Sequence, residues 1–430
     1  MNSGVTDIQQ AEQKAKHGKL RVAVYLECDT DVGGQYQYAL SIVRALELRP
    51  DLFDIYCYSS RSVWKHYSKE RSVHYRPFPM SVATSRMGQR LVRRHLANHR
   101  PPSWVGRLLR RRLFKDRIDT VIFPLPTALV GALGGATSIP SITTIHDLVY
   151  RYVPELREEG HSSTEWYDDL YQYILTNSST VLTDSEVCAN QLRETFPAAT
   201  ATANIQVLPY CAPPYVNEYL REMKRNPQII TADISKEVRD ATAKPFIFSP
   251  ASFTRHKNHD RLLQALRQLA DEGLIVNAVF SGPPWPPQDE LKSLIAKYDL
   301  QAQTTVLSYV SNYEVCHLYS QAQALVMPTF NGPTNLPPLE AFALGCPVVI
   351  SDIFKESDQL RSGVLLFDPR SSEDIARAIR KIVSDEDLRS ELIEAGHQRD
   401  KELNLEAFST RLTEIVSATA AGGNDDCGRT

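Results

Sequence analysis

The sequence lacks a strong excess of charge of either sign and has no close pair of cysteines. It contains 48 Lys+Arg against 51 Asp+Glu, so its formal net charge is only -3. The seven cysteines lie far apart, no CxxC pair occurs and their number is odd, which argues against a disulfide framework and against a zinc cage. A reducing cytosol is the compartment that fits this cysteine usage best.

Two further absences narrow the class of protein. Residues 1–19 are polar and alternate in charge, so they lack the apolar core that a secretory signal requires, and we expect a disordered lead-in there. No GxGxxG follows any predicted strand, which disfavours an enzyme that binds a nicotinamide dinucleotide.

One uncharged stretch, Val121 to Ile145, is long enough for a membrane span. It contains Pro124, Pro126 and Pro140 together with three glycines, and in lipid its backbone groups would lack hydrogen-bond partners. We therefore predict a strand, a loop and a second strand over these residues.

The composition that is present is typical of a globular protein with several domains. The chain has 430 residues, of which 42% are hydrophobic and 23% are charged. At roughly 150 residues per domain, this length indicates two or three domains that can each bury a large core. Collagen-like, disordered and mini-protein classes are excluded.

The first half alternates short β-branched runs with helical stretches. Strands are expected at Leu20–Leu26, Thr120–Phe123, Ser141–Ile145 and Thr180–Thr183. Such a βα rhythm implies a parallel sheet covered by helices on both faces. We place a first α/β domain at 20–209, and the segment 210–244, which mixes prolines with charged residues, is predicted to be a linker or surface insertion.

The second half repeats this architecture without repeating the sequence. Strands are expected at 245–249, 275–281, 304–307, 324–327 and 347–350, and an amphipathic helix at 261–270. The second α/β domain covers 245–405 and a C-terminal helix covers 406–417. Residues 418–430 are small and polar, and we expect a flexible tail.

The most informative stretch is Ala324 to Ser351. A predicted buried strand leads through a loop of glycine, proline and asparagine into a helix that opens at Leu336-Pro337-Pro338 and stops at Gly345. Prolines fit the first turn of a helix, and glycine fits its left-handed C-terminal position. The helix start aims N–H groups and the positive end of the dipole at one point, where an anionic ligand is expected.

Two charged side chains accompany this helix start. Glu340, in the predicted first turn, is able to accept hydrogen bonds from a ribose diol; alternatively, an early glutamate only favours the helix dipole. Lys257 lies with Arg255 and His256 in the loop Ser249–His259, between a strand and a helix. It is suited to hold a phosphate and to neutralise charge on a leaving group; the alternative is a solvated basic loop.

Two short motifs in the first half follow predicted strands. They are Gly33-Gly34 and His146-Asp147. Both lie at the carboxyl ends of strands, where open parallel sheets bind ligands. A glycine pair alone is a weak signal, and the alternative for His146 is a turn residue capped by Asp147.

Taken together, these and further motifs resemble glycosyltransferase family 4. The matching motifs are Gly33-Gly34, Thr144–Leu148, Val181–Ser185, His256-Lys257-Asn258, Tyr309-Val310-Ser311, Leu336–Ala341 and Gly345–Val349. Their order and spacing match over roughly Leu20 to Val416. The resemblance implies the GT-B fold: two Rossmann-like domains with parallel sheets facing across a cleft, the acceptor held by the first and a nucleotide-sugar by the second.

The resemblance also assigns roles by position. Glu340 corresponds to the acid that binds the ribose, and Lys257, with His256 beside it, to the lysine on the diphosphate. Gly34 corresponds to a backbone donor near the phosphates and His146 to a histidine near the transferred sugar, so His146 and Lys257 are the expected catalytic residues. The remaining donor-binding positions are Tyr309 and Val310 at the nucleobase, and Thr334, Asn335 and Leu336 at the sugar.

Two positions depart from the family pattern. Gly332 stands where the family has the first of two glutamates, and Ala251 stands where it often has an arginine six residues before the lysine. We expect the polar side chains and amides of the loop before Leu336 to hold the sugar, and His256 or Arg255 to assist at the phosphates. The alternative is weakened catalysis.

The predicted function is transfer of a hexose, with retention of anomeric configuration, from a nucleotide-sugar to a glycan or lipid-linked glycan in polysaccharide or glycoconjugate biosynthesis. General family similarity favours GDP-mannose as the donor. We expect no metal and no cofactor, since the nucleotide-sugar is a co-substrate. The alternative, suggested by Gly332, is a catalytically weak pseudoenzyme that binds a sugar nucleotide as a subunit of a glycan assembly complex.

The segment Arg86 to Arg117 is strongly basic. It carries eleven lysines and arginines against one acid, Asp116, and interleaves them with apolar side chains. This composition suits an anionic membrane surface, so we expect a cytoplasmic protein that docks peripherally at the inner face of the membrane and meets a lipid-linked acceptor there. Nucleic acid is the competing, less favoured partner, and a solvated helical face is the remaining alternative.

Overall fold

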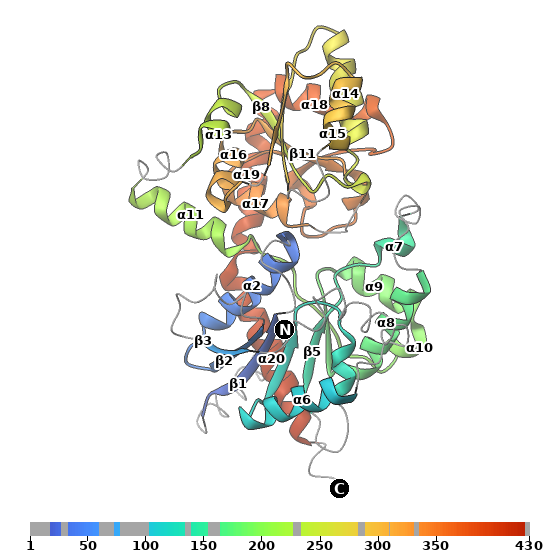
Figure 1. Cartoon of the computed structure of the whole chain (residues 1–430), viewed down its shortest axis with the longest axis vertical. Helices are drawn as coiled ribbons and strands as arrows, with labels where there is room; N and C mark the ends of the chain where they lie inside the picture. The colour runs from blue at the N-terminus through green and yellow to red at the C-terminus, as the bar shows by residue number, and fades with distance from the viewer. Residues whose placement is uncertain are drawn as a thin grey trace. The chain divides into compact units, whose positions relative to one another are not determined.

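The computed structural model describes residues 18–26, 33–59, 73–77, 103–133, 139–153, 164–226, 234–282, 289–308, 310–330 and 335–425. The chain forms two compact units (Figure 1). The first unit takes 1–148, 162–209 and 405–430, and the second takes 149–161 and 210–404. Each unit is built on one parallel sheet, as predicted for an α/β fold of two Rossmann-like domains.

The sheet of the first unit has seven strands in the order β3-β2-β1-β4-β5-β6-β7. The strands are β1 (Leu20–Leu26), β2 (Phe53–Ser59), β3 (Val73–Pro77), β4 (Thr120–Phe123), β5 (Ser141–Thr144), β6 (Thr180–Thr183) and β7 (Ile205–Val207). The predictions are confirmed for β1, β4, β5 and β6, which are almost wholly buried. Burial on both faces explains why they read as continuous apolar and β-branched runs.

Helices connect these strands and set the direction of the crossovers. They are α2 (Gly33–Glu47), α6 (Ser103–Lys115), α8 (Thr164–Asn177), α9 (Glu186–Thr195) and α10 (Pro197–Thr200), with the 3-10 turn η1 (Ala128–Ala132). From β1 the chain builds outward through β2 to β3, and from β4 it builds in the opposite direction to β7. The order therefore switches between β1 and β4, which is where open parallel sheets bind ligands.

The last helix, α20 (Leu405–Asp425), belongs to the first unit although it ends the described chain. Figure 1 shows it running beside the strands of that unit. Ser409 Oγ donates to the carbonyl of Ala45 at 2.6 Å, and the hydroxyls of Thr419 and Thr180 lie 2.7 Å apart. The prediction of a flexible tail from residue 418 was therefore wrong as far as Asp425, because the alanines at 418, 420 and 421 favour a helix and α20 packs on the first unit. Residues 426–430 lie outside the described part of the chain.

The sheet of the second unit has six strands in the order β10-β9-β8-β11-β12-β13. The strands are β8 (Phe246–Pro250), β9 (Asn277–Ser281), β10 (Thr304–Leu307), β11 (Ala324–Met327), β12 (Val348–Ser351) and β13 (Val364–Phe367). The expected strands are present within one or two residues, and β13 is an addition. The order switches between β8 and β11. From β8 the following strands are added on one side of the sheet, and from β11 they are added on the other side.

The second unit surrounds its sheet with the helices that follow. They are α7 (Val149–Tyr152), α11 (Pro214–Arg225), α13 (Lys236–Ala241), α14 (His259–Asp271), α15 (Asp289–Lys297), α16 (Asn312–Gln321), α17 (Leu336–Leu344), α18 (Ser372–Ser384) and α19 (Glu386–Glu402), with the 3-10 turns η3 (Arg255–Lys257), η4 (Asp352–Phe354) and η5 (Arg361–Gly363). Helix α14 carries the expected amphipathic pattern. Its leucines 262, 263, 266 and 269 are fully buried, and each such side chain contributes about 1.5–3 kcal/mol through burial.

Residues 210–244, predicted to be a linker or surface insertion, contain two helices of the second unit within their described part. They form α11 and α13 within the second unit, and Tyr215, Val216 and Tyr219 of α11 are buried. Prolines 213 and 214 open α11, where proline is tolerated because those N–H groups have no partner inside the helix. The prolines that suggested a linker therefore mark a helix start, while residues 227–233 lie outside the described part of the chain.

The uncharged stretch from Val121 to Ile145 contains β4, η1 and β5, as predicted. Residues 134–138 within it fall outside the described ranges. Across the part of the chain that the structure describes, no helix has both the length and the apolar character needed to cross a membrane.

Candidate active site

The candidate site of the second unit lies at the carboxyl ends of β8 and β11. Lys257 follows β8, and Asn335 and Leu336 follow β11. These strands are neighbours whose connections leave in opposite directions, and open parallel sheets bind ligands outside the carboxyl ends of such strands. The predicted phosphate-binding lysine and the predicted anion-binding helix start therefore occupy the same edge of one sheet.

A single asparagine ties the lysine loop to the neighbouring strands. Asn258 adopts a left-handed backbone with φ of 60°, a conformation that asparagine tolerates better than most residues. Its buried side-chain amide donates to the carbonyl of Pro328 at 3.0 Å and to that of Pro369 at 2.7 Å. These carbonyls follow β11 and β13, so one side chain fixes three loops of the carboxyl edge.

His256 adds a second connection between the same loops. Its carbonyl accepts from the backbone N–H of Phe330 at 2.8 Å and from Thr329 Oγ1 at 3.2 Å. His256 Nε2 lies 3.3 Å from Thr254 Oγ1. The side chains of His256 and Lys257 are both half-buried, and the backbone of His256 is bonded to the segment that follows β11.

Helix α17 starts with few backbone donors. An α-helix leaves its first four N–H groups without partners inside the helix, and Pro337 and Pro338 remove two of them. Asn335 and Leu336 carry the remaining two. The helix ends as predicted at Gly345, whose φ of 69° suits glycine.

Glu340 is the fifth residue of α17 and therefore lies in the second turn, not in the first as predicted. Its side chain is buried and accepts two hydrogen bonds, from Tyr215 Oη to Oε1 at 2.7 Å and from Tyr319 Oη to Oε2 at 2.8 Å. Burial raises the pKa of Glu340, and these two hydrogen bonds oppose that rise. The interpretation that Glu340 only favours the helix dipole does not explain why two buried tyrosine hydroxyls donate to its carboxylate.

The cations around the site are distributed differently from the prediction. Arg255 is strongly exposed, and its Nε lies 3.7 Å from Glu290 Oε1 of α15. The guanidinium groups of Arg370 and Arg261 lie 5.5 and 5.8 Å from the ring centre of Phe330. Arg255 thus lies near α15, whereas two arginines that the sequence interpretation had missed flank Phe330, three residues after β11.

Ala251, which stands where the family often has an arginine, is held against the end of β9. Its N–H donates to the carbonyl of Ser281 at 2.9 Å. A Cβ added at Gly282 would come within 2.3 Å of the carbonyl oxygen of Ala251. The backbone at Ala251 is therefore fixed by a close approach that requires glycine at its neighbour.

The first unit brings Gly34 and His146 onto neighbouring elements. Gly33 and Gly34 open α2 and are exposed, and residues 27–32 before them lie outside the described ranges. One turn later, the ring of Tyr38 packs edge-on against His146, with ring centres 4.9 Å apart. Tyr38 Oη also lies 3.2 Å from Thr144 Oγ1 at the end of β5.

The surroundings of His146 keep its imidazole neutral. Its Nε2 lies 3.1 Å from the carbonyl of Pro124, and because a carbonyl only accepts, Nε2 carries the proton. Burial lowers the pKa of His146 to about 4, although the hydrogen bond to Pro124 opposes the shift. At neutral pH His146 therefore carries no charge.

The structure does not describe every predicted site residue. Tyr309, Thr334 and Gly332 lie outside the described ranges. Val310 directly precedes Ser311, which caps α16 in a capping box with Glu314, and so it lies at the carboxyl end of the edge strand β10. In the described part of the chain, no group of histidine, cysteine, aspartate and glutamate side chains has the arrangement of a metal site.

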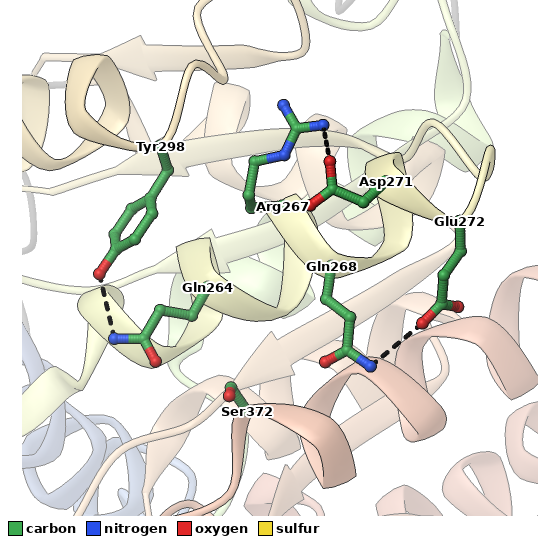
Figure 2. A pocket seen from close by; sticks show the side chains of 7 residues that line it. All are labelled: Gln264, Arg267, Gln268, Asp271, Glu272, Tyr298 and Ser372. Carbon is green, nitrogen blue, oxygen red and sulfur yellow. Dashed lines mark hydrogen bonds and ion pairs between the residues drawn. The ribbon is translucent and has the colours of Figure 1, made fainter.

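A shallow pocket elsewhere in the second unit is not the candidate site. It lies on the polar side of α14 and is lined by Gln264, Arg267, Gln268, Asp271, Glu272, Tyr298 and Ser372 (Figure 2). Its side chains bond to one another: Gln264 to Tyr298 and Gln268 to Glu272, each at 3.1 Å, and Arg267 to Asp271. The pocket shares no residue with the carboxyl edge of the sheet.

Models of known protein families match residues in both units. The model of glycosyl transferases group 1 matches residues 231–399, and that of the glycosyl transferase 4-like domain matches residues 33–211. The chain belongs to the glycosyl transferases of group 1. This membership agrees with the resemblance seen in the motifs of both halves.

Two relatives of this glycosyl transferase match over part of their length. The O-antigen chain mannosyltransferase RfbU of Salmonella typhimurium is 35% identical over 92 residues, which are 21% of this chain and 26% of the relative. The O-antigen chain mannosyltransferase B of Escherichia coli is 28% identical over 156 residues, which are 36% of this chain and 41% of the relative. The matches therefore span less than half of either relative.

Solved structures match over nearly the whole glycosyl transferase. Sucrose-phosphate synthase from Thermosynechococcus elongatus has a TM-score of 0.71 at 16% identity, covering 94% of this chain and 100% of that one. Anabaena HepE in complex with UDP-glucose has a TM-score of 0.64 at 14% identity, covering 93% of this chain and 100% of that one. At these identities the likeness concerns the fold alone, which is the GT-B fold.

Proposed function

We propose that this protein transfers a hexose from a nucleotide-sugar to a glycan or lipid-linked glycan, with retention of anomeric configuration and without a metal. The observation that carries the proposal is the position of Lys257 and the start of α17 at one switch point of the second sheet. An ammonium group and a helix N-terminus at one point are suited to bind a diphosphate.

The charges that develop during transfer fit these groups. As the glycosidic bond breaks, negative charge grows on the departing diphosphate and positive charge grows on the sugar. Lys257 and the N–H groups of Asn335 and Leu336 stabilise the negative charge. In the first unit, a neutral His146 near the transferred sugar adds no positive charge that would oppose the cationic character of the sugar. Gly34, at the exposed start of α2, serves as a further backbone donor to the phosphates.

The identity of the donor rests on the relatives. Both O-antigen relatives are named mannosyltransferases, which favours GDP-mannose, whereas HepE was solved with UDP-glucose, which makes UDP-glucose the competitor. A thermal-shift panel of GDP, UDP, ADP and their sugar derivatives tests this choice, because a ligand stabilises the folded state once its concentration exceeds its dissociation constant. We expect the largest shift with GDP and GDP-mannose; a larger shift with UDP would overturn the choice of base, and no shift with any nucleotide would overturn the function.

Turnover separates an enzyme from a nucleotide-binding subunit. We expect wild-type protein to release the nucleoside diphosphate from its donor when a glycan or lipid-linked glycan is added. Nucleotide binding without turnover, with every donor and acceptor tried, would instead favour the pseudoenzyme that Gly332 suggests.

We further propose that α6 docks the protein on an anionic membrane at the cytoplasmic side. Leu109 and Leu113 of α6 are fully buried, whereas Arg107, Arg111 and Lys115 are exposed. Their spacing of four residues gathers the three cations on one face of the helix. The described part of the basic segment begins at residue 103, so its residues 86–102 lie outside the structure's description.

Two contacts of Asp116 turn the acid of this segment towards its own unit. Asp116 accepts from Arg76 Nε at 2.9 Å and from Tyr58 Oη at 2.7 Å, so the acid of this segment pairs with the sheet of its own unit. Phe114, on the same side as Arg107 and Arg111, is 46% exposed and is suited to enter the lipid interface.

Vesicle sedimentation at low salt tests the docking. We expect full-length protein to pellet with vesicles containing anionic phosphatidylglycerol and not with neutral phosphatidylcholine. A triple variant, R107A/R111A/K115A, should bind roughly 100-fold more weakly, since each cation near the surface contributes about 1 kcal/mol. The matched control R221A/K224A/R225A removes three exposed cations from α11 and should bind normally; equal loss in both variants, or tighter binding to a DNA duplex than to vesicles, would overturn the proposal.

A further inference from the structure

Three buried side chains from three helices of the second unit meet in one cluster. Tyr215 comes from α11, Tyr319 from α16 and Glu340 from α17. Each tyrosine hydroxyl donates to a different carboxylate oxygen of Glu340, at 2.7 and 2.8 Å. The three side chains are at least nine-tenths buried, with exposed fractions of 8%, 1% and 7%.

The two tyrosines are the groups that compensate the buried carboxylate. Burying an ionised carboxylate without hydrogen bonds is strongly unfavourable. In the described part of the chain, no lysine, arginine or histidine forms an ion pair with Glu340. The ionised form of Glu340 therefore depends on Tyr215 and Tyr319.

The arrangement leaves acceptor capacity on both oxygens. A carboxylate offers about four lone-pair sites, and the two hydroxyls occupy one site on each oxygen. An arginine bound to both carboxylate oxygens would have neutralised the negative charge of Glu340. Two neutral donors instead keep a full negative charge and one acceptor site on each oxygen, which suits a diol whose two hydroxyls lie side by side.

The ring of Tyr319 packs against a strand of the site, and Tyr215 comes from a helix outside it. Tyr319 packs edge-on against Phe248 of β8, with ring centres 5.0 Å apart, and β8 is the strand that leads to Lys257. Tyr215 is the second residue of α11, which forms part of the segment that the sequence had suggested to be a linker. The cluster thus connects the carboxylate to the strand carrying the phosphate-binding lysine.

We propose that Tyr215 and Tyr319 are positioning residues that orient the Glu340 carboxylate for the ribose diol of the nucleotide and keep it ionised. This inference rests on the proposed nucleotide-sugar function. The competing interpretation is a clamp in which the three side chains only hold α11, α16 and α17 together.

The test measures nucleotide affinity against pH in the full-length chain. The variants are Y215F and Y319F, with Y219F as a matched control, because Tyr219 is a buried tyrosine of α11 whose hydroxyl does not bond to Glu340. Dissociation constants for GDP and UDP are measured by calorimetry from pH 5 to 9, together with the thermal midpoint of each variant. We expect Y215F and Y319F to bind the preferred nucleotide about tenfold more weakly than wild type, and Y219F to bind like wild type.

The pH profile separates positioning from clamping. Losing one hydroxyl donor makes Glu340 easier to protonate, so the pH below which nucleotide binding fails should move upward in Y215F and Y319F. A clamp would lower the thermal midpoint and leave that pH unchanged. In an E340Q background, Y319F should cause no further loss of affinity, because the tyrosine acts through the carboxylate.

Each outcome decides the proposal. Unchanged affinity and pH profile in both tyrosine variants, or additive losses in the double variant, would overturn the positioning role while leaving the nucleotide site intact. Failure of wild type to bind any nucleotide would overturn the proposed function and this inference with it. Should one tyrosine variant fail to fold, the other decides by the same criteria.

Discussion

The side-chain amide of Asn258 donates to the backbone carbonyl of Pro328 across 3.0 Å, joining the loop that carries Lys257 to the segment after β11. The same amide reaches the carbonyl of Pro369. One buried side chain therefore sets the spacing between the two groups that we propose hold the diphosphate. Its left-handed backbone explains why an asparagine, and not a longer amide, occupies this position.

Replacing Asn258 tests this connection. In N258G the backbone conformation is permitted but the amide is lost, and two buried carbonyls lose their donor; we expect a loss of roughly 2–4 kcal/mol in the free energy of unfolding. N258A should lose more, since alanine is strained at a positive φ. Urea denaturation measures both values, and N277A, which removes an exposed asparagine bond to Pro245, is the control. Equal stability of N258G and wild type would contradict the assigned role.

Lys257 should act on the chemical step more than on binding. We expect K257A to lower kcat by about 100- to 1,000-fold, because it removes a donor from the point where negative charge grows. Steady-state kinetics with the preferred donor measure the effect. K292A, which removes an exposed lysine of α15, should match wild type; a K257A enzyme with normal kcat would show that the lysine belongs to a solvated loop.

The raised pKa of Glu340 predicts how stability depends on pH. A carboxyl group that holds its proton more tightly in the folded than in the unfolded state stabilises the fold below its ordinary pKa of 4.5 and loses that stabilisation as the pH rises through the raised value. E340Q removes this titration. The thermal midpoint of E340Q relative to wild type should therefore increase between pH 5 and 8, while nucleotide affinity falls; a difference in midpoint that does not change with pH would contradict the prediction.

The lowered pKa of His146 has the opposite consequence. Because protonation is disfavoured in the fold, the stabilisation by neutral His146 is present above the ordinary pKa of 6.5 and is lost as the pH falls towards about 4. H146Q should be less sensitive to acid than wild type over that range. Thermal unfolding from pH 7 to 4 measures this, with H74Q as the control, since His74 is about half exposed. Equal acid sensitivity of H146Q and wild type would show that His146 does not titrate in this way.

Local patterns in the sequence determined much of the fold. Buried parallel strands have to be apolar along their whole length, so β1, β4, β6 and β11 were predicted at their observed bounds. Two prolines and a glycine likewise marked the ends of α17. Strands β2, β3, β7 and β13 were not predicted. Strands β3, β7 and β13 lie at the edges of their sheets, where pairing on one side only permits short runs. Strand β2 is internal, and Asp54 interrupts its apolar run.

Other features were decided only by the tertiary structure. Glu340 meets Tyr215, which lies 125 residues earlier in the chain, and α20 returns to the first unit to bond Ala45, which lies 364 residues before Ser409. No local period or spacing encodes such pairs, because they arise when separately formed helices pack against a common sheet. The sequence by itself determined which residues carry charge near a switch point, while packing decided that Arg255 faces α15, that Arg261 and Arg370 flank Phe330, and that two tyrosines hold the glutamate.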